Sequence, residues 1–109
     1  MAARAKPTSL RRSSKPKIPR SFALMGHLIK VRRLPLSRWR VADAVGYFDP
    51  QRMVIALCTA SSVSAQEQTF WHEATHAMLY VMGNAKYSDE GFVDQLGGLI
   101  HQIVHTSEF

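Results

Sequence analysis

Two histidines and a glutamate in the second half of the chain have the types and the spacing of a metal site. The run His72-Glu73-Ala74-Thr75-His76 matches the pattern HExxH. On a helix, residues four apart share one face, so both imidazoles can reach a single Zn²⁺. Glu73 can then act as general base on a zinc-bound water. Such a short motif arises by chance in a chain of this composition with a probability of about one in a hundred, so the surrounding sequence has to support it.

An acidic pair further along the chain supplies candidates for a third ligand. The metzincin pattern HExxHxxGxxH is absent, because Leu79 and Met82 occupy the positions of its Gly and its third His. Glu90 follows His76 by fourteen residues, and Asp94 comes one helical turn later on the same face. In this gluzincin-like arrangement Glu90 would be the third zinc ligand, and Asp94 would accept an N–H of a ligating histidine. Asp94 is the rival to Glu90 for the ligand position itself.

His101 and His105 form a second pair with a spacing of four residues. At 1.5 Å per residue, His101 lies about 16 Å along a helix axis from Glu90, too far to join the same metal. The helix dipole also favours His near the C-terminus of a helix. We therefore interpret this pair as a feature of the helix end rather than as a second metal site, and the isolated His27 as structural or exposed.

A helix must carry the HExxH motif, and the sequence predicts one that starts near Ser64 and runs to Met82. Ser64 and Glu67 have the spacing of a capping box, and Gly83 fits the position just after the helix. At about 100° per residue, the histidines fall opposite an apolar stripe that could anchor the helix. The members of this stripe are Phe70, Ala74, Ala77, Met78 and Val81.

A second helix is predicted from about Asp89 to His105, with Ser88 or Asp89 as its N-cap. Gly97 and Gly98 lie in the interior of this helix. A glycine there costs roughly 1 kcal/mol unless another element has to approach closely. We therefore expect a tight crossing by the HExxH helix at these glycines.

Strands are predicted before the first helix. The β-branched residues Ile29 and Val31 favour a strand from Leu28 to Leu34. A β-hairpin is predicted from two apolar arms, Val45–Phe48 and Met53–Cys58, joined by Asp49-Pro50-Gln51-Arg52. In this turn Pro fixes φ, and Asp accepts a local backbone hydrogen bond. The second arm is apolar on both faces, which predicts a central strand.

Length and charge divide the chain into an arm and one domain. The 109 residues suit a single domain. Residues 1–42 carry a net charge of +12 and residues 43–109 a net charge of −6. We expect residues 1–20 to be a disordered basic arm, which could contact nucleic acid or another polyanion, and residues 21–109 to form the folded domain.

Targeting signals and disulfides are not expected. The longest uninterrupted apolar run, Met53 to Cys58, is far shorter than the roughly 20 residues that span a bilayer, and no secretory signal is recognisable. Cys58 is the only cysteine, so it cannot form an intrachain disulfide. We expect a cytoplasmic protein in a reducing compartment.

The motifs resemble the small zinc metallopeptidases of the ImmA/IrrE-like group, particularly the short versions encoded by phages and mobile elements. The resemblance covers roughly residues 28–105 and rests on the runs Gly46-Tyr47-Phe48-Asp49-Pro50, Gln66-Glu67-Gln68-Thr69-Phe70-Trp71 before HExxH, and Glu90 to Leu96. The chain departs from many members at Thr75, where they have Gly, and in the spacing within the second helix.

This resemblance implies an α+β, minimal zincin-like fold, in which a small sheet with a hairpin packs on the HExxH helix and a second, C-terminal helix brings the glutamate. It implies Zn²⁺ held by His72, His76 and Glu90, with Glu73 as catalytic acid/base and Asp94 beside the ligands. The activity it implies is hydrolysis of a peptide bond in a protein or peptide substrate.

A second hypothesis treats the metal as purely structural. A folded part of about 80 residues has a small core, and a bound metal ion commonly stabilises domains of that size. The chain would then be a non-catalytic, zinc-stabilised binding protein whose basic arm contacts nucleic acid or a partner protein. Structural zinc sites usually have four protein ligands and are rich in Cys. The three well-placed ligands here favour the hydrolase.

Overall fold

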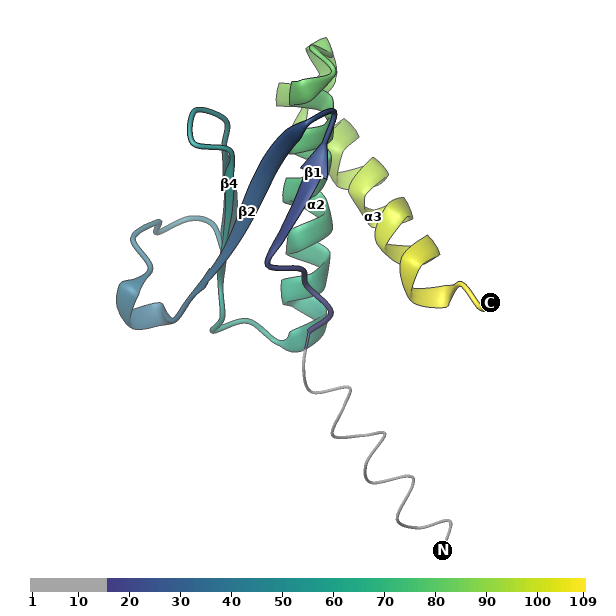
Figure 1. Ribbon diagram of the computed structural model, residues 1–109. Coiled ribbons are helices and arrows are strands. Elements are labelled where there is room, and N and C mark those ends of the chain that lie inside the picture. Colours follow the sequence, from purple (N-terminus) through teal and green to yellow (C-terminus); the bar gives the residue numbers. More distant parts are fainter. Residues whose placement is uncertain (1–15) are drawn as a thin grey trace, which may run out of the picture.

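The structure is a computed structural model that describes residues 16–109, so most of the expected basic arm, residues 1–15, lies outside the described residues. The described part is an α+β domain with a four-stranded sheet and two long helices. Helix α2 (Val63–Val81) packs on the sheet, and helix α3 (Glu90–Thr106) packs on α2 (Figure 1). The predicted α+β class is confirmed. None of the helices in residues 16–109 has the length and apolar character needed to cross a membrane.

The sheet has the strand order β1-β2-β4-β3. Antiparallel pairs join β1 (Ser21–Leu24) to β2 (His27–Leu34) and β3 (Gly46–Asp49) to β4 (Val54–Cys58), whereas β2 and β4 run parallel. The predicted hairpin and the central position of its second arm are thus confirmed. As predicted, the Asp49 carboxylate accepts hydrogen bonds within the turn, from the N–H groups of Gln51 and Arg52 at 3.0 and 3.2 Å.

Strand β1 is an addition to the sequence-based prediction. It is joined to β2 by the two-residue loop Met25-Gly26, in which both residues have positive φ, 48° and 83°. Two positive φ angles give the tight turn whose twist suits a hairpin. Ile18, before this strand, packs against the core. The packed part of the chain therefore includes residues that precede Ser21.

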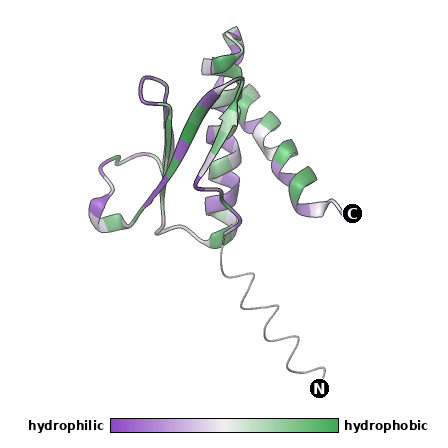
Figure 2. Cartoon of the chain, viewed as in Figure 1, coloured by the Kyte–Doolittle hydropathy of each residue, from purple (hydrophilic) through white to green (hydrophobic). Residues whose placement is uncertain are grey.

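The core forms between the sheet and α2. The sheet contributes Ile29, Ile55 and Leu57, which are fully buried. The members of the predicted helical stripe that face them are Phe70, Ala74 and Ala77, at most 2% exposed. Figure 2 shows the mixture of apolar and polar residues along α2, as expected for a helix with different partners on its two sides.

The start of α2 differs from the prediction. Ser62, not Ser64, is the N-cap, and its hydroxyl accepts a hydrogen bond from the Ala65 N–H at 3.2 Å. Glu67 does not close a capping box, because its carboxylate is engaged by the Lys17 N–H and by His105. The predicted end is confirmed: Met82 is the C-cap, and Gly83 follows with a φ of +66°.

Helix α3 begins and crosses α2 as the sequence predicts. Asp89 is its N-cap and accepts a hydrogen bond from the Phe92 N–H at 3.0 Å. A short 3-10 helix, η2 (Ala85–Ser88), connects α2 to this cap. A Cβ atom at Gly97 would lie 3.1 Å from the Cα of His72, whereas one at Gly98 would meet nothing within 4 Å. Gly97 alone therefore permits the close crossing.

Candidate metal centre

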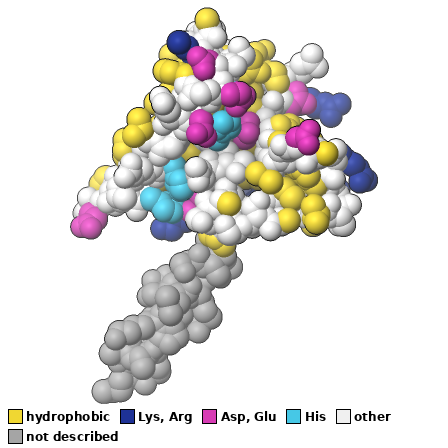
Figure 3. Space-filling model, turned by 180° about the vertical axis from the view of Figure 1, so that it is seen from behind, with side chains coloured by type: hydrophobic (Ala, Val, Ile, Leu, Met, Phe, Trp, Pro, Cys, Tyr) yellow, Lys and Arg dark blue, Asp and Glu magenta, His cyan; other side chains and the backbone are white. Residues whose placement is uncertain are grey.

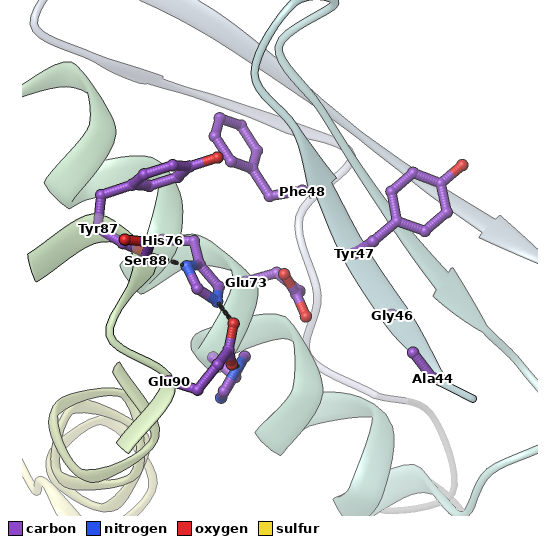
Figure 4. A pocket seen from close by; sticks show the side chains of 10 residues that line it. Ala44, Gly46, Tyr47, Phe48, Glu73, His76, Tyr87, Ser88 and Glu90 are labelled. Atoms are coloured by element: carbon purple, nitrogen blue, oxygen red, sulfur yellow. Dashed lines mark hydrogen bonds and ion pairs between the residues drawn. The ribbon is translucent and has the colours of Figure 1, made fainter. Parts of the chain in front are cut away.

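The HExxH histidines and Glu90 converge where α3 begins beside α2. The two carboxylate oxygens of Glu90 each face one imidazole: Oε1 lies 3.1 Å from Nε2 of His72, and Oε2 lies 3.1 Å from Nε2 of His76. The imidazole rings lie 5.1 Å apart between centroids. Figure 4 shows Glu90 reaching towards His76 from the opposite helix. All three predicted ligand residues are thus brought together.

The other nitrogen of each imidazole has an oxygen partner. Nδ1 of His76 lies 2.7 Å from the backbone carbonyl of Tyr87, to which it can donate only when it carries the proton. Nδ1 of His72 lies 3.4 Å from Oδ1 of Asp94. The Tyr87 carbonyl favours the His76 tautomer that leaves the Nε2 lone pair turned towards Glu90. Nε2 of His72 lies within hydrogen-bond distance of Glu90 Oε1. The sequence predicted that Asp94 would lie beside a ligating histidine. The contact with the Tyr87 carbonyl could not be predicted from a residue pattern, because it involves a backbone group.

This donor set fits zinc. Two imidazole lone pairs facing one carboxylate repel each other unless a proton or a cation lies among them. Tetrahedral zinc with bonds of about 2.0–2.1 Å places its ligand atoms about 3.3 Å apart, close to the two distances of 3.1 Å to Glu90. Asp94 approaches the far side of the His72 ring, so its position matches that of a supporting residue better than that of a ligand.

Glu73 lies beside these three residues and is more buried than Glu90. It is only 8% exposed. Burial raises the pKa of its carboxyl to about 7; His76 opposes this shift and Glu90 adds to it. A carboxyl group with a pKa near neutrality can both accept and return a proton. Figure 4 shows Glu73 on the sheet side of His76, facing the cleft.

An open cleft of about 480 Å³ separates this cluster from strand β3. Its sheet side is formed by Gly46, Tyr47 and Phe48, and its helical side by the histidines, Glu73 and Glu90. A second hollow, of about 280 Å³, is also lined by His72 and Glu73 and reaches Thr69 and Asp94. The linings of the two hollows share Ala44, Gly46, His72 and Glu73, and we call the two together the groove.

Strand β3 presents main-chain groups to this groove. The Cys58 N–H donates to the Val45 carbonyl, so in the antiparallel ladder the alternate residues Gly46 and Phe48 turn their N–H and C=O groups away from β4. Because β3 is an edge strand, these groups have no strand partner in the described sheet. A Cβ at Gly46 would collide with the Thr69 methyl, so glycine lets β3 approach α2 this closely.

Two tyrosines, Tyr87 and Tyr80, lie near the cleft. Tyr87 lines it, and burial, helped by the neighbouring Tyr80, raises the pKa of its hydroxyl. Tyr80 packs against the rings of Tyr87 and Phe48 and is 42% exposed. Tyr87 is therefore the better placed of the two to meet a molecule in the cleft.

Comparison with known proteins gives this chain no relative: no protein family, curated protein or solved structure matches it. The site itself consists of two imidazoles and a carboxylate in mutual contact, a buried carboxyl beside them, and an open groove bordered by a strand edge.

Proposed function

We propose that this chain is a zinc-dependent metallopeptidase of the minimal zincin type, similar to the ImmA/IrrE-like group. The observation that carries the proposal is that Nε2 of His72 and Nε2 of His76 each lie 3.1 Å from an oxygen of Glu90, next to the buried Glu73. A site built only to stabilise the fold is usually closed by four protein ligands. Here three residues converge beside an open cleft, which supports a catalytic role.

Each residue of the site has its own role in the proposed reaction. His72, His76 and Glu90 would hold Zn²⁺, and Asp94 and the Tyr87 carbonyl would hold the imidazoles in the orientation that binding needs. When bound, the zinc ion supplies Lewis acidity for the scissile carbonyl and for a water molecule. Glu73 takes the proton from the attacking water and returns it to the leaving amine. Its burial keeps the carboxyl ready for both steps at neutral pH.

The substrate class proposed is an extended peptide segment. Such a segment can lie in the groove as an added strand on β3, with its main chain bonded to the outward N–H and C=O groups of Gly46 and Phe48. Glu73 borders both hollows of the groove, which together offer room for residues next to the scissile bond. Tyr87 can donate a hydrogen bond to the carbonyl oxygen as negative charge develops on it.

Zinc content and hydrolysis, measured on the same preparations, test this proposal. The zinc content of the wild type, His72→Ala and His27→Ala would be measured by elemental mass spectrometry. His27 is an exposed residue of β2 away from the site and serves as the matched control. We expect His72→Ala to hold one zinc fewer per chain than the other two proteins and to lose cleavage of an unfolded protein such as casein. Equal zinc in all three proteins would refute the site. Zinc loss with no hydrolysis by any of them would favour the non-catalytic binding protein.

A further inference from the structure

Two histidines of α3 lie outside the HExxH site and face a carboxylate of α2. The ring centroids of His101 and His105 are 4.4 Å apart, closer than the 5.1 Å between His72 and His76. Oε1 of Glu67 lies 2.7 Å from Nε2 of His105 and 3.9 Å from Nε2 of His101. Figure 3 shows histidine side chains gathered at two separate places on one face of the molecule.

This second cluster is largely buried and contains a nitrogen without a partner in the described part of the chain. Glu67 is only 4% exposed, and its other oxygen, Oε2, accepts a hydrogen bond of 2.7 Å from the Lys17 N–H. Nε2 of His101 is buried and has no hydrogen-bond partner among residues 16–109. A buried polar atom without a partner is costly. A metal ion would satisfy this nitrogen, the second imidazole and the buried carboxylate at once.

We infer that Glu67, His101 and His105 form a second metal site, of a chemistry suited to Zn²⁺. Tetrahedral zinc places its ligand atoms about 3.3 Å apart, a value between the two distances of 2.7 and 3.9 Å from Glu67 to the imidazoles. The candidate ligand atoms of this cluster lie within 4.8 Å of one another, as do those of the first site. Both clusters offer two imidazoles and one carboxylate, so the ligand set of the second cluster is the same as that of the HExxH cluster.

The two sites are separate. His101 follows Glu90 by eleven residues of the same helix, which is about 16 Å along its axis. The second cluster therefore lies further along the contact between α2 and α3, beyond the crossing at Gly97. A hollow lined by Lys17, Ser62, Ser64 and His105 adjoins it and leaves room for a water molecule as fourth ligand.

The second ion would join the start of α2 to the end of α3, at a place where a third segment also contacts Glu67. Glu67 belongs to the first turns of α2, the two histidines to the last turns of α3, and the Lys17 N–H to the segment before β1. A cation on Glu67 and the histidines would fix the end of α3 against the start of α2. This inference does not depend on peptidase activity, because it concerns residues that do not border the cleft.

Zinc stoichiometry in matched variants tests the second site. Full-length wild type, His72→Ala, His105→Gln and His27→Ala would be stripped with a chelator and titrated with ZnCl₂ against a chromophoric competitor. The His105 side chain is 44% exposed, so His105→Gln should fold, and the amide can still donate a hydrogen bond to Glu67. A simple hydrogen bond would survive this change, whereas a zinc ligand would be lost. We expect two zinc ions for the wild type and His27→Ala, and one for each of the other two variants.

The outcomes separate this inference from the proposed function. One zinc in the wild type and one in His105→Gln, or two in both, would overturn the second site. One zinc ion in both the wild type and His72→Ala, with none in His105→Gln, would instead refute the HExxH site and leave the second site standing. As a second measurement, added zinc should raise the Tm of His72→Ala but not that of the double variant His72→Ala/His105→Gln. An equal rise in both would also overturn the inference.

Discussion

A methyl group at Gly97 would stand 3.1 Å from the Cα atom of His72, so α3 rests directly on the backbone of the first histidine of the HExxH motif. The same methyl would lie 3.1 Å from the Trp71 carbonyl oxygen and from the Thr75 hydroxyl. Glu90 is carried by the same helix as Gly97. The absence of a side chain at position 97 therefore sets how close Glu90 comes to His72.

The two adjacent glycines of α3 should respond oppositely to alanine. Gly98→Ala meets no neighbour and should raise the free energy of unfolding by up to about 1 kcal/mol through helix propensity. Gly97→Ala presses on backbone atoms of α2 and should lower it by about 1–2 kcal/mol, with weaker zinc binding because Glu90 moves away. Urea unfolding and zinc titration of both variants measure these effects. Equal stabilisation by both substitutions would contradict the close crossing.

Glu73→Gln should separate chemistry from metal binding. The amide has the shape of the carboxylate and removes a buried ionisable group, so the variant should fold and keep its zinc. Loss of the general base should lower kcat by about 10²–10⁴. Zinc content and hydrolysis of an unfolded protein substrate are the measurements, with His27→Ala as control. Undiminished turnover in Glu73→Gln would exclude the role assigned to this residue.

Asp94→Ala should weaken zinc binding without removing it. Its carboxylate lies 3.4 Å from Nδ1 of His72, and loss of such a supporting partner typically reduces metal affinity about 10–100-fold. Gln95→Ala, at the neighbouring exposed position of the same helix, is the matched control and should retain wild-type affinity. Competition with a chelator of known affinity gives both values. Loss of one zinc ion per chain in Asp94→Ala, as in His72→Ala, would make Asp94 a ligand.

Tyr87→Phe should reduce turnover more than Tyr80→Phe. Tyr87 lines the cleft, whereas Tyr80 is not part of its lining and packs against Phe48. Removal of a hydrogen bond to the developing oxyanion lowers kcat by about 10²–10³, and KM should change little. Steady-state kinetics of both variants test the assignment. Wild-type rates in both variants would show that neither hydroxyl contacts the transition state.

Local chemistry explains why much of the fold could be predicted. The turn at Asp49 and Pro50, the cap at Asp89 and the glycine after Met82 each depend on neighbours within a few residues. The HExxH spacing likewise fixes the geometry of two side chains once a helix is present. Gly97 was predictable because a glycine inside a helix indicates a close approach.

The missed features depend on distant partners or on unusual backbone angles. Strand β1 turns into β2 through Met25, a residue with no preference for the positive φ that it adopts. Glu67 has the spacing of a capping-box residue with Ser64, but contacts with Lys17 and His105 hold its carboxylate elsewhere. These partners are 50 and 38 positions away in the sequence. No local pattern could have joined Glu67 to the histidines of α3.

The shortness of β3 limits what a substrate could gain from it. Outward-facing main-chain groups belong to Gly46 and Phe48, and the next position of the same parity, Pro50, has no N–H to donate. A bound peptide would therefore be gripped over about two alternate residues, and lengthening it beyond that end would add little affinity. The choice of substrate would then depend on which proteins expose a flexible, unfolded segment. Whether the target is locally unfolded would matter more than a long recognition sequence.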